Sequence, residues 1–207
     1  MKTTLSLAFL LLASCAAPAA DGETPSCCSG DDAMAASPAD AAVPRDSLYL
    51  LPESWHDQDA RETRLADLQG EVVVAAMVFT HCQYACPIIL SDLKEIEAQV
   101  PAEARADVRW LLVSMDSERD VPAVLRDYAD RNELDARWTL LHGDAEAVRS
   151  IAAVLGIDYQ RDSAGNFAHS NKITVLDRAG RIAHQAVGLH AKAEPTIQAI
   201  LDQVDGG

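Results

Sequence analysis

The sequence is poor in positive charge. Its 207 residues include 17 Lys and Arg but 32 Asp and Glu, which gives a formal net charge of −15 at pH 7. A surface with this charge repels nucleic acid, so we exclude nucleic acid as a partner. The acidic residues are scattered along the chain, and most of them are expected on a solvated surface. The length is sufficient for one folded domain and a tail.

The apolar runs of the sequence also indicate no membrane-spanning helix. The apolar run at residues 5–12 is too short to cross a bilayer and is typical of a signal peptide. It leads into Leu-Ala-Ser-Cys at residues 12–15, which resembles a bacterial lipobox. We therefore predict a lipoprotein signal peptide at residues 1–14 and an exported protein, held on the periplasmic side of a bacterial membrane by lipid on Cys15. Ala16 favours the outer membrane. An ordinary signal peptide with an incidental cysteine is the alternative.

Large apolar residues are scarce between positions 15 and 45, where Ala, Pro, Ser, Gly and Asp prevail. This composition predicts a lipid-anchored flexible tether at residues 15–45, with the folded domain at residues 46–207. The tether contains Cys27 and Cys28, and adjacent cysteines are strained partners for a disulfide with each other. They are either an accessory metal-binding pair or thiols without a function, and the sequence favours neither.

Cysteine is rare, with five residues in all, and the two in the predicted domain follow its longest apolar run. Residues 72–79 predict a strand buried on both faces. Cys82 and Cys86 come next, and Pro87 opens a segment with apolar residues at helical spacing. The thiols thus lie at a helix N-terminus, where the helix dipole favours the thiolate, which is both nucleophile and metal ligand. A structural disulfide or two buried thiols is the alternative.

The rest of the domain alternates between strand and helix patterns, which predicts an α/β fold with a mixed central sheet flanked by helices. Further strands are expected at residues 47–51, 108–115, 138–141, 172–176 and 181–187, and helices at residues 122–131, 145–155 and 194–204. A turn at residues 177–180 joins the last two strands into a C-terminal β-hairpin, which the final helix follows.

One histidine is a candidate partner for the thiols. His169 lies in the loop before the strand at residues 172–176, where a thioredoxin-like sheet would bring it beside Cys82 and Cys86. Two thiolates and one imidazole form a soft site of low coordination number, which favours copper and especially Cu(I). A structural zinc site typically has four ligands from paired Cys-x-x-Cys units, and the sequence has no second unit of this kind.

Three segments together resemble the SCO/SenC family of copper-handling proteins. They are Phe-Thr-His-Cys-Gln-Tyr-Ala-Cys-Pro at residues 79–87, Ser-Met-Asp-Ser-Glu-Arg-Asp-Val-Pro at residues 114–122, and His-Ser at residues 169–170 ahead of a strand. The resemblance covers residues 46–204 and implies a thioredoxin-like fold and a role in cytochrome c oxidase assembly. The lipobox stands where family members often have an N-terminal transmembrane helix.

The resemblance also implies roles for individual residues. It places the copper ligands at Cys82, Cys86 and His169, for copper as Cu(I), Cu(II) or both. It makes Asp116 and Asp120 supporting or partner-facing residues. The implied partner is a respiratory oxidase subunit or another copper chaperone. Nothing in the sequence indicates an oligomeric state.

Two functions are compatible with these residues. The favoured one is a copper metallochaperone, a protein without enzymatic activity that passes copper to a respiratory oxidase copper centre. The alternative is a thiol–disulfide oxidoreductase in which Cys82 and Cys86 are catalytic and keep the target's copper-ligand cysteines reduced. Such enzymes use a Cys-x-x-Cys spacing and a cis-proline facing it. This chain has three residues between its cysteines and no proline between Pro122 and Pro195.

Overall fold

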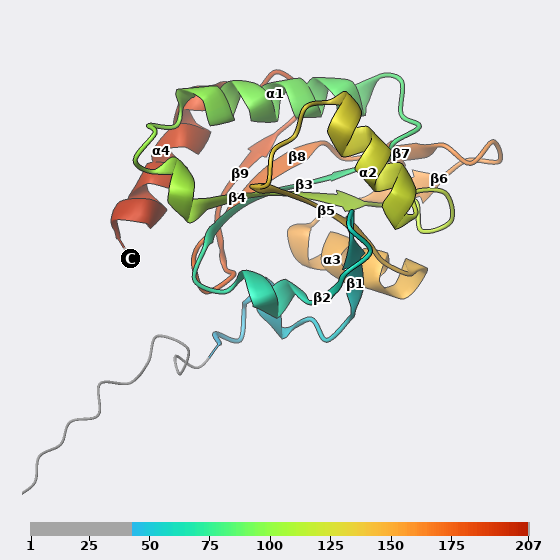
Figure 1. Ribbon diagram of the computed structural model, residues 1–207, viewed down its shortest axis with the longest axis horizontal. Coiled ribbons are helices and arrows are strands. Elements are labelled where there is room, and N and C mark those ends of the chain that lie inside the picture. Colours follow the sequence, from blue (N-terminus) through green and yellow to red (C-terminus); the bar gives the residue numbers. More distant parts are fainter. Residues whose placement is uncertain (1–42, 207) are drawn as a thin grey trace, which may run out of the picture. The chain divides into compact units, whose positions relative to one another are not determined.

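The computed structural model describes residues 43–206 (Figure 1). The predicted signal peptide, the lipidation of Cys15 and the cysteine pair at 27 and 28 lie outside these residues. Within them, no helix is both long enough and apolar enough to cross a membrane.

A seven-stranded mixed sheet forms the centre of the domain, in the strand order β2-β1-β5-β4-β3-β8-β9. Its strands are β1 Trp55–Asp57, β2 Glu62–Thr63, β3 Val72–Val78, β4 Val108–Ser114, β5 Trp138–His142, β8 Lys172–Leu176 and β9 Ile182–Val187. The central strands β3, β4 and β5 are parallel, whereas β1 and β8 pair antiparallel with them. The predicted mixed sheet and the C-terminal hairpin β8–β9 are confirmed.

Helices cover both faces of this sheet. Figure 1 shows α1 (Ala85–Gln99), α2 (Pro122–Arg131) and α4 (Ala193–Asp205) on one face and α3 (Ala145–Leu155) on the other. Crossovers between parallel strands are right-handed. Because β3, β4 and β5 follow one another across the sheet in one direction, α1 and α2 lie on the same face. The predicted α/β fold of the thioredoxin-like type is therefore confirmed.

The apolar run that precedes the cysteines is the middle of this architecture. All seven residues of β3 are buried, because β4 and β8 flank the strand and helices cover it. Helix α1 buries Ile89, Leu93 and Ile96 at helical spacing, as the sequence predicts. The helix begins at Ala85, two residues earlier than predicted, so its first turn includes Cys86.

The predicted strand at residues 47–51 is wrong. The segment forms a 3-10 helix, Leu48–Leu50, capped by Ser47, whose Oγ accepts the N–H of Tyr49 at 3.0 Å. Leu48 and Tyr49 are buried in the core. These apolar residues thus pack into the core as a short helix and not as a strand. A single apolar run in the sequence does not distinguish a buried strand from a short buried helix.

The loop predicted before the strand at 172–176 contains an unpredicted hairpin. Strands β6 (Tyr159–Arg161) and β7 (Phe167–His169) form a separate two-stranded sheet. Each has only three residues, none of them fully buried, so apolar alternation is absent. The Asp162 carboxylate accepts two backbone N–H groups of the turn, and Gly165 takes φ +82° there. His169 is therefore the last residue of a strand.

Candidate metal centre

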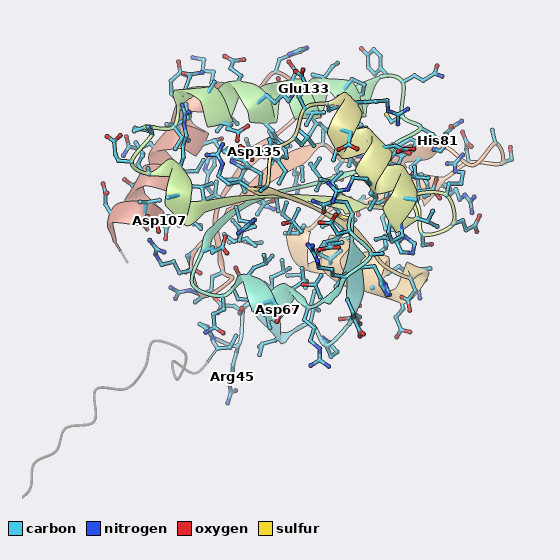
Figure 2. The ribbon with its side chains drawn as sticks, viewed as in Figure 1. Arg45, Asp67, His81, Asp107, Glu133 and Asp135 are labelled. Atoms are coloured by element: carbon cyan, nitrogen blue, oxygen red, sulfur yellow. The ribbon has the colours of Figure 1, made fainter. Side chains whose placement is uncertain are left out.

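The two thiols lie at the sheet edge where the parallel strands β3 and β4 end. After β3 the chain turns through residues 80–84 into α1, which places Cys82 in the turn and Cys86 in the first turn of the helix. Figure 2 shows His81, which belongs to this turn, at the side of the domain from which the β6–β7 hairpin projects. The fold thus brings the thiols and the hairpin to one end of the molecule.

Both cysteines are free thiols, and their exposure differs. Cys86 is 1% exposed, and its Sγ accepts the N–H of Phe79 at 3.5 Å. Cys82 is partly exposed, and its Sγ accepts the N–H of Cys86 at 3.3 Å. Cys82 is therefore the thiol that solvent or another protein can reach.

The pKa values of the two thiols shift in opposite directions. Burial raises the pKa of Cys86 well above its ordinary range. Burial also acts on Cys82, but the backbone N–H groups of Cys86, Tyr84 and Ala85 stabilise its thiolate, and the net pKa is lowered. The expectation that the helix N-terminus favours the thiolate therefore holds for Cys82 and is wrong for Cys86.

The β6–β7 hairpin brings His169 to the buried thiol. Its Nε2 lies 3.9 Å from the Sγ of Cys86, and its Nδ1 lies 3.2 Å from the carbonyl oxygen of Ser170. The carbonyl needs a donor, so the proton belongs on Nδ1 and the lone pair of Nε2 faces the sulfur. Burial lowers the pKa of His169, which keeps the imidazole neutral at pH 7. Sulfur and nitrogen donors on one ion stand about 3.5–3.8 Å apart, so a closer approach by about 0.1–0.4 Å would bring this pair to the spacing of a shared metal.

The three predicted ligands form an open row. In the described part of the chain, the donor atoms that all lie within 4.8 Å of one another belong to a neighbouring histidine and two aspartates, and not to this set. Cys86 contacts Cys82 on one side and His169 on the other. A common ion therefore requires a rotation of the Cys82 side chain, which its partial exposure permits.

The neighbouring group is His81 with Asp116 and Asp120, and its carboxylates are already occupied. Asp120 is fully buried and accepts the N–H of Thr80 at 2.9 Å and the Thr80 hydroxyl at 2.5 Å. It also accepts the Ser114 hydroxyl at 2.6 Å. Asp120 therefore ties the cysteine turn to the end of β4.

Asp116 has a partner of its own. It is 1% exposed and forms an ion pair with Arg119, which in turn donates to the carbonyl oxygen of Gly165 in the hairpin turn. Both aspartates are therefore buried, and their carboxylates are bound within the domain.

Comparison with known proteins places the chain in a family. Its sequence matches the profile of the SCO1/SenC family over residues 53–205. The chain belongs to the SCO1/SenC family. A curated relative, the SCO1 protein homolog of Bacillus subtilis (strain 168), is 31% identical over 97 residues, which are 46% of this chain and 50% of the relative. The chain thus spans half the length of this SCO1 homolog.

Solved SCO1/SenC structures have the same fold. The ScoI of Arabidopsis thaliana with copper bound superposes with a TM-score of 0.66 at 19% identity, covering 75% of this chain and 97% of that one. A SCO1/SenC family lipoprotein from Bacillus anthracis str. Ames gives a TM-score of 0.67 at 23% identity, covering 72% and 91%. At these identities the likeness establishes the fold.

Sequence reasoning does not single out three residues that support the site in this SCO1/SenC domain. They are Thr80, Ser114 and Arg119. For Thr80 and Ser114 a usable signal exists, because each is a polar residue at the end of an apolar run. Parallel strands end at the same sheet edge, so such residues are expected to meet. Arg119 contacts a turn that is 46 positions away, and no local pattern indicates this.

Proposed function

We propose that this protein binds copper as Cu(I) through the sulfurs of Cys82 and Cys86 and the Nε2 of His169, and passes it to a copper centre of a respiratory oxidase. The observation that carries the proposal is the distance of 3.9 Å between the Nε2 of His169 and the Sγ of Cys86. The two residues are 83 positions apart in the sequence. Two sulfurs and one imidazole are a donor set that suits Cu(I). The ScoI of Arabidopsis thaliana and the Sco1 of yeast, which share the fold, are described with copper bound.

The open row of donors supports delivery rather than storage. Cys82 borders a hollow of about 380 Å³, beside Tyr84, whose side chain is 76% exposed. A donor atom of an oxidase subunit, or of another copper chaperone, would reach the ion from this hollow. It would displace Cys82 first, because Cys86 and His169 lie deeper. An ion with three ligands leaves room for such an exchange.

Thiol–disulfide exchange is the second candidate function, and the lowered pKa and exposure of Cys82 favour it. The Cys82 thiolate would attack a client disulfide and form a mixed disulfide while one client sulfur leaves as a thiol. Cys86 would then lose its proton and attack Cys82, which releases the second client thiol. Two electrons pass to the client, and the chain ends as a disulfide. His169 has no role in this sequence.

The change His169→Ala separates the two functions. We propose to use the full chain with Cys15, Cys27 and Cys28 changed to serine, here called the three-serine chain, so that no other thiol competes for copper. The binding free energy of Zn²⁺ at sites with four ligands is about 10–16 kcal/mol, which is about 3 kcal/mol per ligand. Loss of the imidazole is therefore expected to weaken Cu(I) binding about a hundredfold, measured against a competing chelator. The rate of reduction of a test disulfide is expected to stay the same.

The control for this prediction is His56→Ala, which removes an exposed imidazole from β1, a strand that β5 and β4 separate from β3. It is expected to change neither measurement. If His169→Ala binds Cu(I) as tightly as the unchanged three-serine chain while both reduce the disulfide equally, the copper proposal is wrong and the oxidoreductase remains.

The proposal includes a lipid anchor at Cys15. The lipobox supports it, and the SCO1/SenC family protein from Bacillus anthracis str. Ames is likewise a lipoprotein. Changing Cys15 to alanine is expected to move the protein from the membrane fraction to the soluble fraction of cells. Changing Cys27 and Cys28 to alanine together is the matched control and is expected to leave it with the membranes. Ala16 favours the outer membrane, which separation of the two membranes on a density gradient would test. Continued membrane association of Cys15→Ala would exclude the anchor.

A further inference from the structure

We infer that Arg119 positions the imidazole of His169 for metal binding, because it fastens the turn of the β6–β7 hairpin to the end of β4. The inference rests on the proposed function, since it concerns the same site. Arg119 acts through His169 and is therefore a positioning residue, which supplies no donor atom to the ion.

The hairpin has few other means of holding its place. Within the described chain its strands pair only with each other and form a sheet separate from the central one. At its base the N–H of Ser170 donates to the carbonyl of Asp158 at 2.8 Å. On one side Phe167 packs edge-to-face against Phe79, with 5.2 Å between ring centroids. The ring of His169 also lies edge-on to Phe79, with 6.3 Å between centroids, so these rings hold the base of the hairpin. The turn at its other end is held by contacts with the loop between β4 and α2.

Arg119 makes one of these contacts with the turn. Its Nη2 donates to the carbonyl oxygen of Gly165, and its Nε donates to the carboxylate of Asp116. Asp116 is buried and also accepts the backbone N–H groups of Glu118 and Arg119, at 3.3 and 3.2 Å, so its carboxylate is a fixed point. A planar guanidinium held along one edge directs its other N–H groups rigidly. The position of the turn therefore follows the end of β4.

The turn is shaped to receive this guanidinium. Gly165 takes φ +82°, a conformation that residues with a side chain rarely adopt. A Cβ atom at this position would lie 3.3 Å from Nη1 of Arg119, closer than ordinary contact. The glycine thus serves both the backbone turn and the close approach of the arginine.

A second bridge joins the same loop and the same hairpin, and it serves as a comparison. Arg161 on β6 forms two hydrogen bonds of 2.7 Å with the carboxylate of Glu118. These side chains are 39% and 66% exposed. Water and salt screen an ion pair of this kind, which contributes about 0–1 kcal/mol. Arg161 is therefore a matched arginine that joins the same segments with little expected effect on the site.

The loop between β4 and α2 thereby holds both halves of the site. Asp120 fixes Thr80 beside the cysteine turn, and Asp116 fixes the hairpin through Arg119. Two carboxylates four residues apart thus fasten the cysteine turn and the hairpin turn to the same loop.

A double-mutant cycle in the three-serine chain tests the inference. Cu(I) dissociation constants are measured against a competing chelator for Arg119→Lys, His169→Ala and the two together. Lysine keeps a positive charge beside Asp116. It lacks the separate nitrogen atoms with which the guanidinium binds Asp116 and the carbonyl oxygen of Gly165 at the same time. We expect Arg119→Lys to weaken binding about 10- to 100-fold when His169 is present, and by less than about threefold when it is alanine. Arg161→Lys is expected to change binding by less than about threefold in either case.

Three outcomes decide the matter. The expected dependence on His169 supports a positioning role. An equal loss in both backgrounds, or no loss while His169 is present, overturns it. If His169→Ala by itself leaves the Cu(I) affinity unchanged, His169 is not a ligand and the proposed function fails. The inference about Arg119 then fails as well, because Arg119 has no ligand to position.

A second variant covers the case in which Arg119→Lys does not fold. Gly165→Ala disturbs the same contact from the hairpin side and leaves the ion pair of Arg119 with Asp116 in place. It is expected to show the same dependence on His169. Hydrogen exchange of the amides at residues 159–169 is expected to accelerate in both variants and not in Arg161→Lys. Unchanged exchange in Arg119→Lys and Gly165→Ala would contradict the inference.

Discussion

Changing Cys86 to serine is expected to weaken the binding of Cu(I) by about a thousandfold or more. The Sγ of Cys86 lies 3.9 Å from the Nε2 of His169, and the backbone N–H of Cys86 donates to the Sγ of Cys82, so Cys86 is the residue that both other ligands adjoin. Divided over four ligands, the range of about 10–16 kcal/mol gives about 2.5–4 kcal/mol per ligand, and its upper end corresponds to about a thousandfold. The upper end applies to Cys86 because a hydroxyl does not replace a soft thiolate. Competition with a Cu(I) chelator in the three-serine chain provides the measurement.

The fold is expected to survive this change. The serine hydroxyl has nearly the shape of the thiol, and its oxygen can accept the N–H of Phe79 that the sulfur accepts now. Thermal unfolding should therefore stay within a few degrees of the unchanged chain. Cys82→Ser is the companion variant, and we expect it to lose affinity as well. If Cys86→Ser kept its affinity within tenfold while Cys82→Ser lost it, Cys86 would not be a ligand.

The central strand and the helix after it could be predicted from the sequence because their signals are local. Residues 72–79 form an unbroken apolar run, and burial on both faces is the condition under which such a run is stable as a strand. Apolar residues at helical spacing after Pro87 define the helix. The placement of both cysteines where the strand leads into the helix followed directly, because it depends only on the order of the two segments. The inclusion of Cys86 in the first turn of the helix did not follow.

The hairpin could not be predicted in this way, because its stability does not come from its own sequence. Its strands have three residues each, and its place depends on Phe79 and Arg119, which come from elements far away in the chain. The same reason explains why the pKa values of the two thiols were not distinguished. The burial of each thiol and the number of N–H groups that it meets depend on the folded turn before α1 and on the first turn of the helix, and spacing does not reveal them.

Changing Asp120 to alanine is expected to destabilise the domain by about 3–5 kcal/mol. The carboxylate is fully buried and accepts three hydrogen bonds, two from Thr80 and one from Ser114. Alanine would remove the acceptor of the buried Ser114 hydroxyl and of the partly buried Thr80 groups, and would free the cysteine turn from β4. For a domain of this size the melting temperature should fall by about 6–20 °C. The affinity for Cu(I) should fall about 10- to 100-fold, because Asp120 orients a ligand-bearing turn without binding the ion.

Two further variants make this prediction specific to the buried carboxylate. Asp127→Ala removes an exposed carboxylate from α2 and is expected to change stability by less than about 0.5 kcal/mol. Asp120→Asn keeps one acceptor oxygen and is expected to lie between alanine and the unchanged chain. Cu(I) competition is measured below the melting range of each variant, where the domain is folded. Denaturant unfolding is measured on the same samples. A stable Asp120→Ala with unchanged Cu(I) affinity would mean that Thr80 and Ser114 hold the turn by other contacts, and the supporting role of Asp120 would be lost.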